Sequence, residues 1–480
     1  MHLRDSLSTP HDPAARDILK TMRIAVIGGG FTGLTAAYEL GKVGHEVTVF
    51  EKEKTLGGLA HGFKQKNWDW HLEGAYHHLF TNDNAIINLV KELGLEKKLI
   101  IKRPITATLM SEDVHAESQQ NFAGLHFASA DEYRITDSDD SREKLKARLN
   151  FRWRPKHAQI YQLDSPQNLL AFPYLSPVDK LRTASLLAFL KLNPFWQPLE
   201  NVTAEKFFKT IGGKKAWEVL WEPLMRGKFG EYAPTIAASW LWARIKKRTP
   251  SLYYIDGGFQ TLVHTLEKEI KLLDGTIRTG TSIATLAPLA KFDKILLTIP
   301  TPIAMKLVNL PSSYTKPLLK IPHLHAQTLI LETKEPILKN TYWLNINDRS
   351  FPFLAVVAHT NFMDKKHYGG HHLTYFGNYL PTGHPYLSMT KDQLLKVFLP
   401  YIKRLNSPFN NWQLVNSFSF VGPFAQPVHQ LHYSKIAPTI QTPIPNIYLA
   451  NLDSIYPWDR GTNYAVELGQ RAAKVINSDE

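Results

Sequence analysis

The clearest pattern of apolar and polar positions begins at Arg23. Residues Ile24 to Ile27 form a short apolar run that predicts a buried strand. The stretch from Thr32 to Val43 has apolar residues at helical spacing, and Glu46 to Phe50 alternates as a second strand. These three segments predict a compact strand–helix–strand unit.

Similar patterns recur far along the chain. An apolar face that repeats between Leu262 and Ile270 predicts a helix, and residues 276 to 283 then read as a strand. The apolar run from 292 to 300 predicts another buried strand. Residues 446 to 476 combine an apolar strand, a polar loop and a helix that begins at Thr462 or Asn463.

Two polar regions interrupt this order. The segment 1–22 has no apolar run long enough for a signal-peptide core, so we expect a flexible tail. Residues 111–152 are polar and mixed in charge, which predicts an inserted loop. Residues 178–196 contain a short apolar helix flanked by lysine and arginine, which fits a buried helix or a helix lying on a membrane surface. No stretch approaches the 18 apolar residues needed to span a bilayer.

Composition narrows the classes of function. The chain has 480 residues and 44% hydrophobic content, enough for a large core and at least two domains. The formal net charge of +13 suggests a phosphorylated substrate or an anionic membrane surface, and without a nucleic-acid motif no nucleic acid is expected. The absence of cysteine excludes disulfides, thiolate metal sites and cysteine nucleophiles. We expect a cytoplasmic protein, with peripheral contact at the inner membrane face as an option.

A glycine motif lies at the first strand-to-helix turn. Gly28, Gly30 and Gly33 form GxGxxG, whose missing side chains permit a tight turn and let a pyrophosphate approach the helix N-terminus. Glu51 ends the second strand, where a carboxylate can accept the hydroxyl hydrogens of an adenosine ribose. Strand, helix, strand and acid together predict dinucleotide binding.

A second glycine pair, Gly57 and Gly58, follows this unit and precedes Leu59. With this order of motifs the chain resembles the superfamily of flavin-dependent amine oxidases, protoporphyrinogen oxidases and phytoene desaturases. The resemblance implies FAD, an α/β fold (α+β overall), and a Rossmann-type FAD-binding domain that is discontinuous in sequence. We place that domain at 23–103, 253–305 and 440–480. A mixed sheet-and-helix substrate-binding domain would comprise 104–252 and 306–439.

The resemblance also implies a set of cofactor contacts. They lie in the glycine turns, beside the acid, in the segment after the second glycine pair, near the adenine, and at the start of the C-terminal helix. The expected residues are Gly28, Gly30, Phe31, Thr32, Gly33, Glu51, Lys52, Gly57, Gly58, Leu59, Gly74, Ala75, His77, Ile283, Asp459, Arg460, Gly461, Thr462 and Asn463.

Two histidines stand together in the stretch GAYHHLF. Adjacent residues of an extended segment point to opposite faces, so His77 and His78 do not converge on one ion and no metal site is expected. The resemblance implies that this segment crosses the flavin ring. We expect His78 and Tyr76 to share the face that handles protons or orients the substrate, with His77 on the other face.

A pair of cations is a candidate site for substrate binding. Arg226 and Lys228, in MRGKFG, lie beside an aromatic-rich segment and are candidates to hold a phosphate or carboxylate, although a solvated loop explains them equally well. Trp240, Trp242 and the basic run 246–248 are candidates for the same entrance.

The sequence is compatible with three functions. The first is an FAD-dependent oxidoreductase that dehydrogenates a hydrophobic small molecule, either anionic or linked to an isoprenoid or glycolipid, by hydride transfer to flavin. The second is a sugar-nucleotide mutase without net redox turnover, because GAYHHLFTND also resembles the histidine-containing stretch of UDP-galactopyranose mutases. The third is a flavin-binding scaffold without enzymatic activity.

Overall fold

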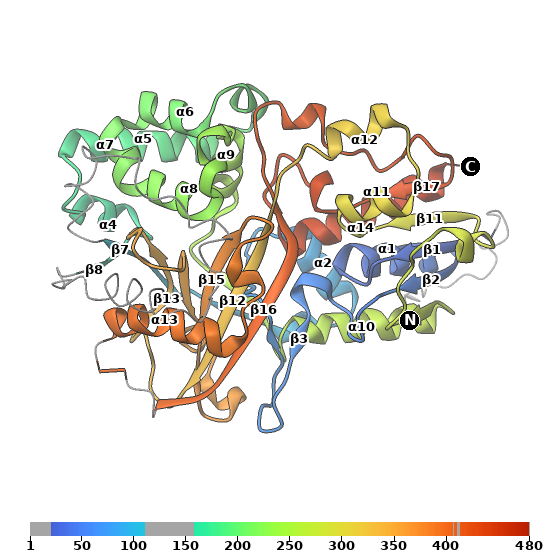
Figure 1. Ribbon diagram of the computed structural model, residues 1–480, viewed down its shortest axis with the longest axis horizontal. Coiled ribbons are helices and arrows are strands. Elements are labelled where there is room, and N and C mark those ends of the chain that lie inside the picture. Colours follow the sequence, from blue (N-terminus) through green and yellow to red (C-terminus); the bar gives the residue numbers. More distant parts are fainter. Residues whose placement is uncertain (1–20, 111–157, 407, 410–412, 480) are drawn as a thin grey trace, which may run out of the picture.

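The computed structural model describes residues 21–110, 158–406, 408–409 and 413–479 (Figure 1). The predicted insertion at 111–152 and nearly all of the predicted tail at 1–22 lie outside these residues. The described chain forms two lobes, with β1, β2 and β11 in one of them and β12, β13 and β15 in the other (Figure 1).

A five-stranded parallel sheet forms the centre of the first lobe. In spatial order its strands are β10 (Thr276–Arg278), β2 (Glu46–Phe50), β1 (Arg23–Ile27), β11 (Lys294–Leu297) and β17 (Ile447–Leu449). The central strands β1 and β11 are apolar after their first residue, because both faces of a parallel sheet are covered. The turn after β1 therefore opens at the carboxyl edge of the sheet, where ligands of such folds bind.

Helices from three distant segments cover this sheet, and others flank it. They are α1 (Phe31–Lys42), α2 (Asn84–Glu92), α10 (Phe259–Leu272), α11 (Thr301–Leu307), α12 (Ser312–Leu318) and α14 (Thr462–Ser478). α14 packs closely on α1, since a Cβ at Gly469 would lie 2.6 Å from the carbonyl oxygen of Thr32. The strand expected at 276–283 ends at Arg278, because its partner β2 ends at Phe50.

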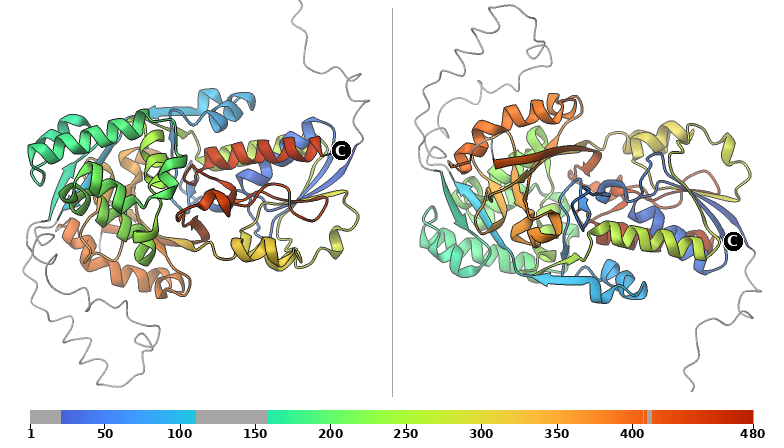
Figure 2. Two further views of the ribbon diagram at one scale, coloured as in Figure 1. Left: turned by 90° about the horizontal axis from the view of Figure 1, so that it is seen from above. Right: turned by 90° about the horizontal axis from the view of Figure 1, so that it is seen from below.

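A seven-stranded sheet forms the second lobe. In spatial order its strands are β16 (Leu414–Pro427), β12 (His323–Thr333), β15 (His372–Leu380), β14 (Ala355–Ala358), β13 (Thr341–Ile346), β7 (Ile105–Met110) and β8 (Gln159–Gln162). Neighbours are antiparallel except for β13 and β7. Helix α13 (Lys391–Leu405) covers one face with Leu394, Phe398 and Ile402. Figure 2 shows α13 and the helices around α5 on opposite sides of this sheet.

A group of helices covers the other face of the second sheet. It comprises α4 (Pro166–Ala171), α5 (Pro177–Leu192), α6 (Ala204–Gly212), α7 (Lys214–Ala216), α8 (Glu222–Phe229) and α9 (Ala238–Lys247). A π-helical turn, 217–221, precedes α8. α8 contacts β13 and β15, so it brings its side chains to the centre of the sheet. The segment around Arg226 is thus helical and not a loop.

Small sheets connect the lobes. β3 (Gly62–Phe63) pairs with β4 (Leu72–Glu73), and β9 (Leu252–Ile255) lies between β5 (Leu79–Phe80) and β6 (Leu99–Lys102). The buried carboxylate of Glu73 accepts hydrogen bonds from Tyr254 Oη (2.8 Å) and the backbone N–H of Phe259 (2.7 Å). These bonds fix the chain where it passes between the lobes.

The predicted apolar helix at 178–196 forms α5 and has two apolar faces. Thr183, Leu186 and Leu190 are buried, whereas Val178 and Leu181 are 66% and 69% exposed. The buried face fits the interpretation as a buried helix, and the interpretation as a membrane-surface helix stays a prediction. No helix in the described part of the chain is long and apolar enough to cross a bilayer.

Candidate functional site

The GxGxxG turn leaves backbone donors at the start of α1 without a side-chain cap. Gly30 is the N-cap of α1, no side chain caps it, and the first turn carries no acidic residue. A Cβ at Gly33 would lie 2.0 Å from the carbonyl oxygen of Gly28, so only glycine lets the helix approach the strand. A Cβ at Gly30 would meet nothing closer than 3.9 Å. The turn therefore has uncapped N–H groups and open space at Gly30, which suit a pyrophosphate.

The second glycine pair docks on the first. The N–H of Gly57 donates to the carbonyl oxygen of Gly29 (2.9 Å), and Gly30 and Gly57 form a short parallel bridge. A Cβ at Gly58 would lie 3.1 Å from the Cα of Gly30, and Gly57 and Gly58 both have positive φ (115° and 58°). Leu59 anchors the following turn against Gly422 of β16. Two motifs separated in sequence thus build one loop pair.

Glu51 is buried at the end of β2 beside this loop pair. Its Oε2 accepts from the N–H of Gly29 (2.7 Å), and its Oε1 accepts from the N–H of Glu53 (2.8 Å). Each carboxylate oxygen keeps acceptor capacity for a hydroxyl group. Lys52 is exposed and pairs with Glu53. Ile283 packs at the same sheet edge, where the N–H of Thr281 donates to the carbonyl oxygen of Glu51 (2.8 Å).

A second uncapped helix start belongs to α14. Gly461 is its N-cap, without a side-chain hydrogen bond and without an acidic residue in the first turn. Thr462 and Asn463 are buried, and Asn463 Oδ1 accepts from the N–H of Ile86 (3.2 Å). Positive potential at a helix start stabilises negative charge nearby. With the loop pair and Glu51, this donor set fits the pyrophosphate, ribose and pyrimidine groups of FAD.

The segment from Gly74 to His78 runs between the two lobes. Thr328 Oγ1 donates to the carbonyl oxygen of Gly74 (2.6 Å), and a Cβ at Gly74 would lie 3.0 Å from the ring of Phe420. Ala75 is partly buried, and its carbonyl oxygen bonds to His77 Nδ1 (2.7 Å). The segment is therefore held at close range to the second sheet.

Tyr76 and His78 contact one wall, and His77 contacts another. The rings of Tyr76 and His78 lie 4.9 and 5.9 Å from that of Trp343 on β13. His77 instead packs against Phe259 at the start of α10, 5.6 Å away. The alternation expected for an extended segment is present, with Tyr76 and His78 on the same side.

Both imidazoles are neutral near pH 7. Burial lowers the pKa of His78 to about 3, and Arg248 and Arg244 contribute to this effect. Burial lowers the pKa of His77 to about 4, with a smaller effect from Arg460. His78 Nδ1 is hydrogen-bonded to Tyr342 Oη (3.0 Å), so Nε2 is the ring nitrogen that Tyr342 does not engage.

β15 supplies the aromatic wall next to this segment. Its residues alternate, with Phe376 toward α13 and Tyr375, Gly377 and Tyr379 toward the site. A Cβ at Gly377 would lie 2.8 Å from the ring of Tyr76, so this glycine makes room for the tyrosine. The ring of Tyr379 lies under two cations, the guanidinium of Arg460 (4.6 Å) and the ammonium of Lys228 (5.0 Å).

Asp459 is the buried centre of a charged network. Its Oδ2 pairs with Arg244 (2.5 Å) and Lys228 (3.6 Å). Its Oδ1 accepts from Trp240 Nε1 (3.1 Å) and Gln426 Nε2 (3.3 Å). Burial alone would raise the pKa of Asp459, but Lys228 and Arg244 outweigh it and hold that pKa well below its usual value. Asp459 is therefore ionised and fully engaged with protein groups.

Arg226 and Lys228 are not brought together. Two residues apart on α8, they face different directions: Arg226 pairs with Glu222 (2.7 Å), whereas Lys228 is buried against Asp459. Burial also lowers the pKa of Lys228 well below its usual value. The idea that these two cations grip one anion is wrong for this structure, because a helix separates positions i and i+2.

The other residues expected at the entrance are buried or bonded to the backbone. Trp240 and Trp242 are both buried, and Trp242 stacks on Trp458. Lys246 donates to the carbonyl oxygens of Lys191 and Leu192, so it has a structural role. Among the described residues no group of three histidine, aspartate or glutamate side chains comes together as a metal site.

Several residues of the site were missed in the sequence. Arg244, Tyr379 and Gln426 come from segments that carry no motif of their own. Arg244 lies four residues before Arg248, and this helical spacing was the signal that could have linked it to the basic run. Nothing local marked Gln426, which orients Asp459 and accepts from Arg460 Nε (2.9 Å).

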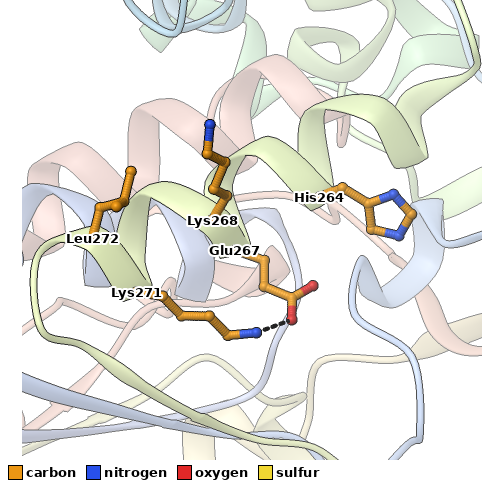
Figure 3. Close-up of a pocket in the computed structure, with 5 residues that line it drawn as sticks. All are labelled: His264, Glu267, Lys268, Lys271 and Leu272. Carbon is orange, nitrogen blue, oxygen red and sulfur yellow. Dashed lines mark hydrogen bonds and ion pairs between the residues drawn. The ribbon is translucent and has the colours of Figure 1, made fainter.

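A surface hollow elsewhere contains none of these residues. It opens along α10 and is lined by His264, Glu267, Lys268, Lys271 and Leu272 (Figure 3). Glu267 and Lys271 form an ion pair of 2.7 Å, and Lys268 is exposed. Because it lies outside the candidate site, Lys268 provides a charge-matched control for changes there.

The sequence matches a family model over most of the chain and a curated relative over a short stretch. A family model described as flavin containing amine oxidoreductase matches residues 31–477. The chain is 36% identical over 81 residues to a zeta-carotene desaturase from Capsicum annuum, but the match spans 17% of this chain and 14% of the desaturase.

Solved structures match over nearly the whole chain. A candidate protoporphyrinogen oxidase from an Exiguobacterium species has a TM-score of 0.69 at 15% identity, and the match covers 96% of this chain and 100% of that one. A reduced UDP-galactopyranose mutase has a TM-score of 0.66 at 13% identity, with 95% and 94% of the chains covered. These likenesses confirm the predicted fold class.

Proposed function

The chain belongs to the flavin containing amine oxidoreductase family, its cofactor is FAD, and we propose that it dehydrogenates an apolar small molecule that carries an anionic group. An isoprenoid- or glycolipid-linked compound has this chemistry. The observation that supports the proposal is one arrangement: a segment lined by aromatic rings and cations runs from the FAD-binding loops to the second sheet. When bound, FAD supplies the hydride acceptor.

The protein groups would then bind, orient and shield the substrate. The rings of Tyr76, Trp343 and Tyr379 provide apolar walls that exclude water. His78, neutral and fixed through Nδ1 by Tyr342, presents Nε2 as a proton acceptor or as an orienting group. Tyr76 lies on the same side of the segment as His78, against Trp343. Lys228, whose charge is committed to Asp459, would position that carboxylate instead of gripping the substrate directly.

Anaerobic bleaching of the flavin tests the proposal. Purified holoenzyme is mixed without oxygen with polyprenyl phosphates, porphyrins, amines and sugar nucleotides, and the flavin absorbance is followed. We expect an apolar anion to bleach the flavin and oxygen or a quinone to restore its colour. No bleaching by any class, in protein that holds FAD and is reduced by dithionite, would contradict the proposal and favour a flavin-binding scaffold.

A second candidate is a sugar-nucleotide mutase. The cations near His78 would suit a diphosphate, and the structural likeness to UDP-galactopyranose mutase concerns the fold alone. Such an enzyme would turn over only after dithionite reduction and would consume no electron acceptor. Sugar-nucleotide isomerisation under those conditions, without bleaching of the oxidised flavin, would replace the first candidate by the second.

We also propose that α5 contacts an anionic membrane, from which an apolar substrate would enter. Leu170, Val178, Leu181, Leu192 and Phe195 are 64–77% exposed, and Lys180, Arg182 and Lys191 lie on the same helix as three of them. Co-sedimentation with vesicles tests this. Wild type should bind phosphatidylglycerol vesicles more strongly than phosphatidylcholine vesicles, and Leu181→Asp should reduce the bound fraction. Equal binding by Leu181→Asp, or equal binding to both lipids, would contradict the membrane contact.

A further inference from the structure

Positive charge exceeds negative charge around Tyr76 and His78. We call Lys228, Arg244, Arg248 and Arg460 the cationic cluster. Asp459 pairs with Lys228 and Arg244. Within the ranges that the structure describes, no carboxylate forms an ion pair with Arg248 or Arg460. Four cations therefore face one paired carboxylate.

Asp459 has no capacity left for the other two arginines. Its oxygens already receive Arg244, Lys228, Trp240 and Gln426. Asp164 attracts Arg248 at longer range without forming an ion pair, and Arg460 stacks on Tyr379. Partly enclosed cations without a counter-charge are costly, and an anionic ligand would remove this cost.

Arg244 and Arg248 are placed to act together. Arg244 lies in the last turn of α9, and Arg248 is the residue that follows the helix and donates its N–H to the carbonyl oxygen of Arg244 (3.2 Å). The C-terminal end of a helix favours cations nearby. The intervening lysines are committed elsewhere: Lys246 donates to carbonyl oxygens, and the ammonium of Lys247 lies 4.9 Å from the ring centre of Trp458.

Arg244 and Arg248 remain open to solvent although protein surrounds them. Arg248 is exposed, and the side chain of Arg244 is 44% exposed despite its bond to Asp459. Burial is nevertheless the main cause that lowers the pKa of Arg248. The residue after Arg248, Thr249, accepts a hydrogen bond through Oγ1 from the N–H of Thr81 (3.1 Å), three residues after His78, so Arg248 lies close to the segment that carries His78.

We propose that Arg244 and Arg248 bind the phosphate or carboxylate of the substrate and so hold its apolar part against Trp343 and Tyr379, beside His78. This inference rests on the proposed function and specifies its substrate class. It predicts an organic anion, although the family is named for amine chemistry: a protonated amine would be repelled by the same cluster. Arg460 would add to the potential without leaving Gln426.

Calorimetric titration of the oxidised holoenzyme tests this proposal. The probes are decyl phosphate, decanoate, decylamine and inorganic pyrophosphate. We expect the two decyl anions to bind and decylamine not to bind. Arg248→Gln should raise the Kd of decyl phosphate about tenfold, the effect of one charge-assisted contact, and Arg248→Lys should recover part of the loss. Added salt should weaken binding.

A matched variant separates local contact from net charge. Lys268→Gln removes one positive charge from α10, in the surface hollow of Figure 3, and should leave the Kd unchanged. Pyrophosphate that binds as tightly as decyl phosphate would support the anion site and assign it to a free diphosphate group. Equal weakening by Arg248→Gln and Lys268→Gln, or decylamine binding as tightly as decyl phosphate, would overturn the inference.

Flavin content keeps this test separate from the proposed function. Each variant is first shown to hold one FAD per chain by its absorbance. Flavin bleaching by a neutral or cationic compound, together with no anion binding, would overturn the anion inference and the anionic group of the proposed substrate, and would leave the flavin-dependent dehydrogenation standing. Anion binding without bleaching by any compound would support the cluster and contradict the oxidoreductase proposal.

Discussion

The glycine loop pair and the cationic cluster, which we propose as the sites of FAD and of the substrate anion, differ in physical character. In the loop pair the backbone acts, since Gly30 and Gly57 lie together and the start of α1 carries N–H groups without a cap. In the cluster, side chains from α8, α9 and the loop before α14 act, and Asp459 neutralises only part of their charge. Binding at the loop pair would need open space, whereas binding at the cluster would need positive charge that a ligand can neutralise. The two regions should therefore respond to different substitutions.

The largest effect is expected in the loop pair, from Gly33→Ala. The new Cβ would lie 2.0 Å from the carbonyl oxygen of Gly28, and neither backbone atom can move without separating α1 from β1. We expect a loss of about 3 kcal/mol in the free energy of unfolding, together with loss of FAD. Urea unfolding and flavin absorbance measure these.

Gly227→Ala is the matched control for this change. Gly227 lies within α8, and its Cβ would meet Leu354 at 3.6 Å, an ordinary contact. Because alanine favours helix, stability should stay the same or rise by about 1 kcal/mol. Equal destabilisation by the two changes would refute the role assigned to the Gly28–Gly33 contact.

The next effect lies between the two regions, at Glu73. Burial raises the pKa of Glu73 to about 7 from an unfolded value of 4.5, so the folded protein binds the proton more tightly. The stability from this group is present below pH 4.5 and is lost as pH rises toward 7. Glu73→Gln should therefore gain about 3 kcal/mol relative to wild type between pH 4.5 and 8.

Denaturant unfolding of both proteins at pH 4.5 and 8 measures this gain. Glu46→Gln, which alters an exposed carboxylate on β2, is the control variant. A constant difference between Glu73→Gln and wild type at the two pH values would show that Glu73 does not change its ionisation on folding.

The two histidines next to the cluster should differ in their effect on flavin reduction. His78 lies near Arg244 and Arg248, whereas His77 packs on Phe259. His78→Ala should slow flavin reduction about a hundredfold, the size of a lost proton-handling group. His77→Ala should slow it less than about tenfold if its role is packing. Rates come from anaerobic stopped-flow with FAD content matched, and equal losses would contradict the division of roles.

The smallest expected effect is that of Gly30→Ala. A Cβ there meets no atom within 3.8 Å, and φ is −78°, so the fold should keep its stability. The methyl group would fill the space that we assign to the pyrophosphate. We expect the Kd of FAD to rise about tenfold, measured by flavin fluorescence quenching on titration of the apoprotein. An unchanged Kd would place the phosphates elsewhere.

The two regions also differ in how far the sequence predicted them. The GxGxxG unit is one continuous stretch of sequence, so the ends of its strands and helix could be predicted within one or two residues. The family resemblance then identified the dinucleotide as FAD. The cluster depends on contacts between distant segments: Arg244 and Asp459 are 215 positions apart yet form one ion pair. Arg226 and Lys228 are nearly adjacent yet separate, because the helical turn directs them differently. Local motifs were readable, and tertiary charge pairing was not.

We propose that the loop pair holds FAD and that the cationic cluster holds the anion of the compound that reduces it. Anaerobic flavin reduction by wild type and Arg248→Gln, using the compound that bleaches the flavin in the panel, tests this most directly. We predict equal FAD content in both proteins, reduction by an anionic compound, and a rate about tenfold lower in Arg248→Gln below saturation. Equal rates in the two proteins, or reduction by a cationic amine alone, would contradict the claim.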